Sequence, residues 1–278
     1  MRSLIKLLVV IIPVTFVLMM SGCIDEPVND SLPGRLNVQL TDAPFPSDLV
    51  AEANVTINKI EIRKSDDSEG YPFIILSEEE MSFNLLDLTN GVTATLVDME
   101  VPSGSYNLIR LYVSEASIVL SDSSEFDLFV PSGAETGIKI YIDPAIVVAG
   151  GLTTELLLDF DVSRSFEVQG NPDTPAGIKG FHFKPVIKAS NLSTTGSLSG
   201  MVTDSTDSVV DGALVSVLAA DTVYTSSLTD STGYYTILGI DAGAYNVKVE
   251  YSDYQPVIFE NIEIFAGNTT VLDAKLTD

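Results

Sequence analysis

The sequence predicts an all-β protein in which two β-sandwich domains follow one another. Short segments of alternating apolar and polar residues recur between residues 35 and 276, and this period of two is that of a half-buried strand. Turn-forming pairs such as Asp211-Gly212 separate the segments. The pattern restarts at Gly196 after a short linker at 191–195, so we expect one domain over 34–190 and a second over 196–278.

The N-terminal residues have the layout of a lipoprotein export signal. Arg2 and Lys6 form a short positive region, and residues 7–20 form an apolar run shorter than the roughly 20 residues of a spanning helix. The run ends at Met20-Ser21-Gly22-Cys23, which resembles the bacterial lipobox except that Met20 replaces the usual leucine. The resemblance implies that residues 1–22 form a removed signal peptide and that Cys23 carries fatty-acyl chains such as palmitate. The alternatives are an ordinary cleaved signal and an uncleaved amphipathic anchor.

An acylated Cys23 makes the membrane the first expected partner. Two or three acyl chains on one cysteine hold a protein firmly to a bilayer. We therefore expect a lipid-anchored protein at the cell membrane or outer surface, on the extracytoplasmic side. Residues 23–33 are polar and contain two prolines, which predicts a tether. Cys23 is the single cysteine of the chain, so no intramolecular disulfide can form.

Both expected domains are acidic. The chain carries 39 acidic and 14 basic residues, with a net charge of −14 over 34–190 and −10 over 196–278. Such a surface repels phosphate backbones, and the sequence contains no Lys/Arg cluster, so nucleic acid is excluded as a partner. High net charge first favours solubility, and binding of divalent cations is the functional alternative.

The second domain is predicted to be a seven-stranded sandwich. Turns are expected at 211–212, 231–233 and 241–243, because Asp, Ser, Thr and Gly accept the backbone of tight reversals. The expected strands are 198–203, 213–218, 224–229, 234–237, 244–251, 258–265 and 270–276.

Several segments of this domain resemble the carboxypeptidase regulatory-like family. They are, in order, 200–204 (GMVTD), 210–213 (VDGA), 229–235 (TDSTGYY), 242–249 (AGAYNVKV) and 254–256 (YQP). The resemblance implies a transthyretin-like sandwich that acts as a spacer or interaction module and is not itself a peptidase. A zinc carboxypeptidase needs two histidines and a glutamate at the metal, whereas this chain has one histidine.

The first domain contains more expected strands and one short helical turn after Leu86. The strands are 36–40, 53–63, 73–76, 82–86, 105–113, 117–120, 126–130, 137–142, 152–160 and 181–189. Two segments recur in the second domain in the same order. Residues 104–108 (GSYNL) recur as 243–247 (GAYNV), and 149–154 (AGGLTT) as 266–270 (AGNTT). The echoes predict that the domains share one plan, with an insertion containing 126–142 in the first.

The first domain also resembles domain-of-unknown-function family 4382. The segments that carry this resemblance are, in order, 35–44, 55–62, 84–91, 102–106, 109–111, 130–133, 158–161 and 184–187. The family occurs in secreted and lipid-anchored microbial proteins. The resemblance therefore implies a domain boundary and an envelope location, but no biochemical activity.

Asp159 and Asp161 are the strongest candidates for site chemistry. They lie two apart on an expected strand, so their side chains leave the same face roughly 6 to 7 Å apart. The pair could hold a calcium ion, or act as acid and base like the retaining-glycosidase carboxyls that lie about 5 Å apart. The structural alternative is that Arg110 or a backbone cap holds one of them, and Arg110 is itself expected in an ion pair.

Other polar residues are expected to have structural roles. Asp42 and Asp87 lie in turn or cap sequences, and His182 has no triad partner motif near it. Asp230 and Gly233 fit a hairpin turn, with a calcium loop as the alternative. Residues 78–80 are expected in a solvated loop.

Five tyrosines of the second domain could form a platform for sugars, although the second and third fit a core or corner role: Tyr234, Tyr235, Tyr245, Tyr251 and Tyr254. Glycosylation sequons begin at Asn54, Asn191 and Asn268.

The sequence contains no catalytic constellation, and it does not identify the residues that bind a ligand. The predicted function is that of a non-catalytic envelope lipoprotein whose first domain binds a glycan or an envelope protein, with the second domain as spacer. The alternatives are a structural component of an envelope protein complex and, third, an enzyme using Asp159 and Asp161. No cofactor is expected other than calcium.

Overall fold

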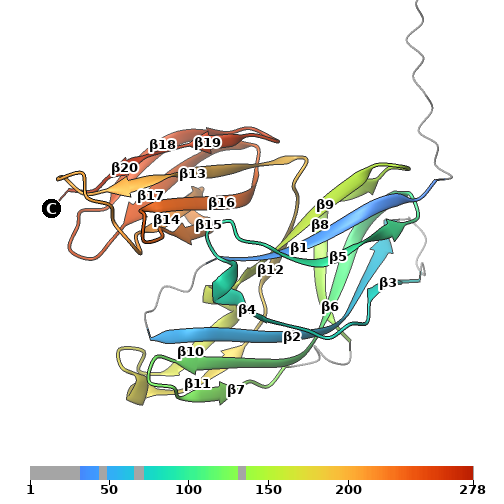
Figure 1. Ribbon diagram of the computed structural model, residues 1–278, viewed down its shortest axis with the longest axis horizontal. Coiled ribbons are helices and arrows are strands. Elements are labelled where there is room, and N and C mark those ends of the chain that lie inside the picture. The colour runs from blue at the N-terminus through green and yellow to red at the C-terminus, as the bar shows by residue number, and fades with distance from the viewer. Residues whose placement is uncertain (1–31, 44–48, 66–71, 131–135, 278) are drawn as a thin grey trace, which may run out of the picture.

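The computed structural model describes residues 32–43, 49–65, 72–130 and 136–277, and it confirms two successive β-sandwiches (Figure 1). The predicted signal peptide and Cys23 lie outside the described residues, as does the tether up to residue 31. The helical elements in the described part are short: η1 (Leu85–Leu88), α1 (Val162–Ser165) and η2 (Pro175–Gly177). The first of them is the helical turn predicted after Leu86.

One sheet of the first domain has four strands in the order β12-β9-β1-β5. Strand β1 (Gly34–Ala43) lies at its centre, antiparallel to β5 (Ala94–Val101) and parallel to β9 (Thr153–Asp161). Strand β12 (Ile187–Asn191) adds to the other edge of β9. Because this pairing is parallel, the C-terminal ends of β1 and β9 lie side by side.

The facing sheet is built around two long strands, β2 (Val50–Lys64) and β6 (Gly104–Leu120). Strands β3 (Ile74–Ser77) and β4 (Met81–Asn84) pair with β2, whereas β7 (Glu125–Asp127) and β8 (Ile138–Val148) pair with β6. A separate hairpin of β10 (Phe166–Gly170) and β11 (Ile178–Phe183) lies at the end of this domain near β7 (Figure 1).

Alternating residues of the two sheets form the core of the first domain. Leu36, Val38 and Leu40 on β1 are fully buried, and the intervening side chains point outward. Burial of each such side chain contributes roughly 1.5–3 kcal/mol. A slip of one residue would expose all of them, so their burial fixes the register of β1 against its neighbours. Phe166 and Phe183 extend the core beneath the hairpin, with ring centroids 5.1 Å apart.

The second domain has its own core between two smaller sheets. One sheet has the order β16-β13-β19, with β20 also on β13, and the other has the order β15-β14-β17-β18. The bounds are β13 (Thr195–Thr203), β14 (Leu214–Ala219), β15 (Thr222–Leu228), β16 (Tyr234–Asp241), β17 (Gly243–Glu250), β18 (Val257–Ile264), β19 (Thr269–Val271) and β20 (Ala274–Lys275). The last predicted strand, 270–276, is thus divided into two short ones.

The two domains share one strand plan. In the first, β1 pairs with β5 and, in parallel, with β9, while β6 pairs with both β2 and β8. In the second, β13 pairs with β16 and, in parallel, with β19, while β17 pairs with both β14 and β18. These pairings confirm the common plan that the two sequence echoes predicted.

Both echoes have the same structural role in each domain. In the turn after β8, the Gly151 amide donates to the Pro33 carbonyl over 3.0 Å, and after β18 the Gly267 amide donates to the Thr195 carbonyl over 2.8 Å. Both glycines have positive φ, which favours glycine because other side chains are strained there.

The GSYNL and GAYNV echo forms a tyrosine corner in each domain. The Tyr106 hydroxyl donates to the Pro102 carbonyl four residues earlier, and the Tyr245 hydroxyl donates to the Asp241 carbonyl over the same spacing. This agrees with the corner role predicted for Tyr245.

The insertion in the first domain differs from the predicted one. Strand β6 continues past Leu111, the last residue that pairs with β8, and runs on to Leu120 where it pairs with β7. Residues 138–142 belong to β8, the counterpart of β18, so the insertion ends before Ile138. It therefore comprises the second half of β6, β7 and the segment before β8.

Three other predicted elements of the first domain were wrong in extent. The segments 105–113 and 117–120 form the single strand β6, and 181–189 splits into β11 and β12 around Pro185, which cannot donate to a ladder. Strand β5 was not predicted, because a bulge beside Val38 buries both Leu96 and Val97 and interrupts the alternation.

Candidate functional site

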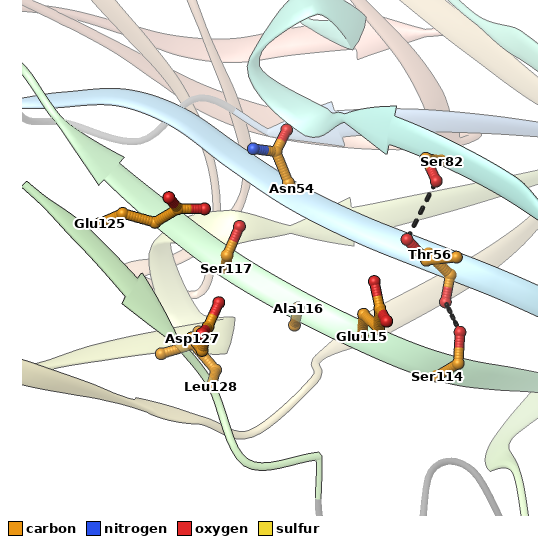
Figure 2. A pocket seen from close by; sticks show the side chains of 10 residues that line it. All are labelled: Asn54, Thr56, Ser82, Ser114, Glu115, Ala116, Ser117, Glu125, Asp127 and Leu128. Carbon is orange, nitrogen blue, oxygen red and sulfur yellow. Dashed lines mark hydrogen bonds between the residues drawn. The ribbon is translucent and has the colours of Figure 1, made fainter. Parts of the chain in front are cut away.

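An open groove of about 490 Å³ crosses the outer face of the β2-β6 sheet (Figure 2). Side chains such as Val55 and Ile57 on β2 point inward to the core, so their neighbours on the strand face the groove. Strands β2, β4, β6 and β7 supply its lining, which is almost entirely polar: Asn54, Thr56, Ser82, Ser114, Glu115, Ala116, Ser117, Glu125, Asp127 and Leu128.

Strand register brings these residues together. Asn54 lies opposite Ser117 on β6, and Ser117 lies opposite Asp127 on β7. Thr56 lies opposite Glu115 in the next row of the same face. Residues from four strands therefore form two rows of amide, hydroxyl and carboxylate groups, because directly opposed side chains leave the same face of a sheet.

Hydrogen bonds within the sheet hold several groove side chains in place. The Thr56 and Ser82 hydroxyl oxygens lie 3.0 Å apart, and the Ser114 hydroxyl donates to the Thr56 carbonyl over 3.4 Å (Figure 2). The Asn54 amide donates to a carboxylate oxygen of Glu52 over 2.9 Å. The groove therefore presents polar groups on a rigid sheet, where positions are better defined than on a loop.

The groove is also rich in negative charge. Figure 2 shows Glu125 and Asp127 at one end and Glu115 further along β6. Within the described residues, none of these three carboxylates has an ion-pair partner. Phe129 directly follows the groove residue Leu128, and its side chain is 83% exposed.

Asp161, which the sequence suggested as a site residue, does not line the groove. It is the N-cap of the short helix α1. Its Oδ1 accepts from the Arg164 amide over 2.9 Å and from the Ser163 hydroxyl over 2.7 Å. Its Oδ2 accepts from Arg164 Nε over 2.5 Å. The backbone cap offered as the structural alternative is thus present at α1.

Arg110 contacts Glu61, and not Asp159 or Asp161 as the sequence suggested. Its guanidinium lies 4.0 Å from Glu61 Oε2 and stacks over the Phe73 ring at 3.8 Å from the centroid. The Tyr112 hydroxyl donates to the same Glu61 oxygen over 2.8 Å. Arg110 is therefore in the predicted type of ion pair, on the β2-β6 sheet and not beside Asp159.

Asp159 lies on the outer face of the other sheet, where the second domain packs against it. Its Oδ2 accepts from the Thr225 hydroxyl of β15 over 3.4 Å. Burial and the nearby Asp161 carboxylate raise the pKa of Asp159 to about 6, while Lys188 on the neighbouring strand opposes the rise. Sequence analysis placed Asp159 on a strand but had no signal for its position between domains.

Asp42 is also at this boundary. The parallel register places Asp42 opposite Phe160, between Asp159 and Asp161 on the neighbouring strand. Its side chain is 5% exposed, and its Oδ1 accepts from the Val162 amide over 3.0 Å, which is a cap as predicted. Burial raises the pKa of Asp42 well above its ordinary value, and the charge of Asp159 adds to the rise.

Polar and apolar contacts join the two domains. Lys188 donates to the Tyr224 hydroxyl and to the Gly239 carbonyl, the latter over 3.3 Å, and its ammonium lies 3.8 Å from Asp241. Leu157 of β9 is fully buried, and a Cβ added at Gly239 would come within 3.0 Å of its Cδ2. The close approach at Gly239 lets β16 lie directly on the first domain.

A turn of the first domain binds the edge of β16. The Asn90 side-chain oxygen accepts from the Thr236 amide over 2.5 Å, and its amide donates to the Tyr234 carbonyl over 3.3 Å and to Asp230 over 3.4 Å. Gly91 follows, and a Cβ there would meet Thr236 Cγ2 at 2.8 Å. The interface therefore has a second anchor point on β16.

The remaining predicted residues have the structural placements expected of them. His182 is exposed on β11 between buried Phe181 and Phe183, Asp87 is exposed in η1, and residues 78–80 form an exposed loop. Asp230 Oδ1 accepts from the amides of Thr232 and Tyr234, as in a turn.

The tyrosines of the second domain do not form one platform. Tyr235 is buried and donates to the Leu272 carbonyl over 2.6 Å, whereas Tyr234 is 55% exposed on the other face of β16. The Tyr251 and Tyr254 rings lie 6.0 Å apart. Of the sequon residues, Asn54 lines the groove, Asn191 ends β12 and Asn268 lies in the turn before β19.

In the part of the chain that the structure describes, no three His, Cys, Asp or Glu side chains are grouped as a metal site. The same part contains no helix that is long and apolar enough to span a bilayer.

Sequence reasoning missed the groove, apart from Asn54 as a sequon. The available signal was the i, i+2 spacing of Glu115 with Ser117 and of Glu125 with Asp127, which puts each pair on one strand face. That spacing alone does not say which strands become neighbours.

Comparison with known proteins yields two family matches. Residues 33–185 match the Domain of unknown function (DUF4382), and residues 197–277 match the Carboxypeptidase regulatory-like domain. No curated protein matches the chain.

Solved structures with similarity include a C-terminal interface mutant of a type II cohesin-X-dockerin complex from Acetivibrio cellulolyticus. It is 25% identical over 29% of this chain and 56% of that chain, with a TM-score of 0.25. The TIE protein of Bacillus anthracis is 13% identical over 88% of this chain and 40% of its own, with a TM-score of 0.28. The minor pilin of Streptococcus agalactiae is 11% identical over 87% and 95%, with a TM-score of 0.26.

The present chain therefore spans about half the length of the cohesin-X-dockerin chain it matches. The first family match covers more than half of the present chain. The protein belongs to the DUF4382 family, and a carboxypeptidase regulatory-like domain follows its family domain.

Proposed function

We propose that this protein is a non-catalytic envelope lipoprotein, held to the membrane through an acylated Cys23, that binds carbohydrate in the groove of its first domain. The single observation that carries the binding role is the groove, with its two rows of fixed polar groups on a sheet face. Membrane attachment rests on the sequence of residues 1–23 alone.

The chemistry of the groove suits a ligand rich in hydroxyl groups. The carboxylates of Glu125 and Asp127 accept hydrogen bonds, and the side-chain amide of Asn54 both donates and accepts them. Phe129 follows the groove residue Leu128 in the chain, and in this proposal its exposed ring offers an apolar face on which a sugar ring can lie. The groove is open to solvent, so a ligand longer than one sugar unit can extend out of it.

The second domain acts in this proposal as a spacer fixed to the binding domain. Lys188 and Asn90 anchor β15 and β16 at two separate points, so the pair of domains forms a stiff unit. A stiff second domain holds the groove at a fixed distance and orientation relative to any envelope component that the second domain contacts.

A structural role in an envelope protein complex is the second candidate. It is favoured by exposed apolar side chains on the β18 and β19 side of the second domain: Ile258, Phe265 and Val271, which are 55%, 56% and 69% exposed. Such side chains are typical of protein contacts when they gather on one surface.

The test is binding of the purified full chain to a broad glycan array, in calcium and in chelator. We expect a reproducible glycan signal that falls at least tenfold in Asp127→Asn and in Phe129→Ala. Phe265→Ala removes an equally large exposed ring far along the chain and serves as the matched control. A blank array, or equal losses in all three variants, would contradict carbohydrate binding in the groove and favour the structural role.

A further inference from the structure

Basic and aromatic side chains gather on the outer face of the sheet formed by β2, β6 and β8, beside the groove along the strands. The register sets Lys59 opposite Tyr112, and Glu61 opposite Arg110. On its other side, Arg110 lies opposite Lys139. Directly opposed side chains leave the same face of a sheet. This surface, called the cationic band below, consists of Lys59, Glu61, Arg63, Arg110, Lys139 and Tyr141.

The alternation along the three strands shows that the band faces outward. Ile60 on β2, Ile109 on β6 and Ile140 on β8 are at most 3% exposed and belong to the core. Their neighbours on each strand therefore point away from the core. The second domain contacts the other sheet, through Asp159 of β9 and Lys188 of β12, so it does not cover the band.

One carboxylate of the band serves two of its cations. Glu61 contacts the Lys59 ammonium, and its Oε2 lies 4.0 Å from the Arg110 guanidinium. That distance is too long for a hydrogen bond, and Arg110 Nε is buried with no hydrogen-bond partner among the described residues. Lys59 is also near Glu78 in the exposed loop at 78–80. The charge of Arg110 is therefore only partly compensated.

The other two cations lack a carboxylate partner. In the part of the chain that the structure describes, neither Arg63 nor Lys139 forms an ion pair. Arg63 lies 5.5 Å from the centroid of the Phe73 ring, on which Arg110 also stacks, and Lys139 is exposed. The band thus has an excess of positive charge in a chain of net charge −25. The sequence contains no Lys/Arg cluster because these residues come from three separate strands.

An exposed aromatic ring belongs to the same surface. Tyr141 is 70% exposed and lies two residues after Lys139 on β8, so both side chains leave one face. The register places Tyr141 opposite Leu108, which in turn lies opposite Arg63. The ring of a tyrosine presents a flat apolar surface with a polar tip. The band therefore combines an apolar surface with cations that lack a partner.

We propose that the cationic band binds an acidic saccharide, whose sugar units carry carboxylate groups. In this proposal the carboxylates pair with Arg63, Arg110 and Lys139, since arginine holds carboxylates by two parallel hydrogen bonds, and a sugar ring lies on Tyr141. A short ligand senses mainly the charges of the band, because charges further away than about 8 Å are screened at physiological salt. A long phosphate backbone would extend over acidic surface. The inference stands independently of binding in the groove.

The first test is isothermal titration calorimetry of the purified full chain with the tetramer of galacturonic acid, at pH 7.5 and low salt. We expect binding that weakens as salt is added, because the contacts are between charges. The methyl-esterified tetramer has the same sugar rings without the charges, and it should bind at least tenfold more weakly. Equal binding of the two tetramers would overturn the proposal.

Variants at exposed positions locate the site without disturbing the core. Lys139→Gln and Tyr141→Ala should each reduce the affinity for the acidic tetramer at least fivefold. Lys179→Gln removes the same charge at an exposed position of β11 and is the matched control. The groove variant Asp127→Asn should retain the binding. A loss in Lys179→Gln equal to that in Lys139→Gln, or a loss in Asp127→Asn, would overturn the placement in the band.

Two other anionic ligands test the class of ligand. Tetraglutamate carries the same number of side-chain carboxylates without sugar rings, and a short single-stranded oligodeoxynucleotide carries phosphates. Both should bind at least fivefold more weakly than the acidic tetramer. Equal or tighter binding of tetraglutamate would assign the band to an acidic peptide, and equal or tighter binding of the oligonucleotide would assign it to nucleic acid. Either result, or no heat with the acidic tetramer, would overturn the saccharide.

Discussion

The two domains are built on the same strand plan, but they differ in what has been added to it. At equivalent turns the Thr154 hydroxyl donates to the Val147 carbonyl over 3.0 Å, and the Thr270 hydroxyl donates to the Glu263 carbonyl over 2.8 Å. The first domain adds the extended half of β6 and β7, and these strands carry much of the polar groove. The comparison teaches that the shared plan supplies stability, whereas the proposed binding surface depends on the insertion.

The largest expected effect comes from two glycines, Gly34 and Gly196, which occupy equivalent positions in the two domains if the strand plan is shared in detail. A Cβ at Gly34 would lie 2.3 Å from the Ala149 carbonyl oxygen, and one at Gly196 would lie 2.4 Å from that of Phe265. We expect Gly34→Ala and Gly196→Ala each to destabilise its own domain by about 3 kcal/mol, because backbone must move. Hydrogen exchange followed by mass spectrometry measures each domain separately.

Gly243→Ala is the control for these two variants, since its nearest neighbours are Tyr245 atoms at 3.5 Å or more. It should change the exchange of neither domain by a comparable amount. If one of the two glycine variants were harmless, the equivalence of the two turns would fail.

The next effect concerns the interface, where the first domain contributes the buried acid. The pKa of Asp159 is raised to about 6 in the folded protein, so between about pH 4 and pH 6 the folded state binds more protons than the unfolded state. In chelator, stability should therefore fall as pH rises through this window, by up to about 3 kcal/mol from this group.

Denaturant unfolding at a series of pH values checks this expectation. Asp159→Asn should make the fall between pH 4 and pH 6 less steep, with the remaining slope due to Asp42, whose pKa is also raised, and Asp211→Asn should leave the profile as it is. A profile that rises through the same window in the chelated protein would show that the carboxyl is stabilised in its charged form.

A smaller effect compares the two tyrosine corners. Tyr106 is fully buried, whereas the bond from Tyr245 to Asp241 lies at the surface. Tyr106→Phe should cost about 1.5 kcal/mol and Tyr245→Phe about 0.5 kcal/mol, because the bond from Tyr106 is partly buried whereas the bond from Tyr245 is exposed to water. Hydrogen exchange of each domain measures the two losses, and equal values would mean that burial does not distinguish the corners.

The smallest effect concerns one exposed ion pair in each domain. Arg35 forms two bonds with Asp98 in the first, and Lys275 contacts Asp207 in the second. Asp98→Asn and Asp207→Asn should both leave the thermal midpoint unchanged within error at 0.15 M salt, because exposed pairs contribute little. A clear drop in either variant would identify a pair that the fold depends on.

The fold could be predicted from the sequence to the extent that its strands alternate. Both sandwiches and all strands of the second domain follow from period-two patterns and turn residues, whereas β5 was hidden by the bulge at Leu96 and Val97. The position of Asp159 between the domains was out of reach, because parallel pairing of β1 with β9 joins Thr41 to Asp159 across more than a hundred residues, and the Thr225 that contacts Asp159 lies in the second domain. The groove required the register of β6 with β7, which local sequence does not encode.

The contact of Asn90 with β16 has a consequence for how copies of this protein meet one another. Strand β16 is an outer strand of its sheet, and its Thr236 amide is a group to which a strand from another molecule could add. The carboxamide oxygen of Asn90 accepts from this amide. The first domain thus protects the second domain against edge-to-edge aggregation. A second domain released by proteolysis would expose the edge of β16 to pairing with another strand.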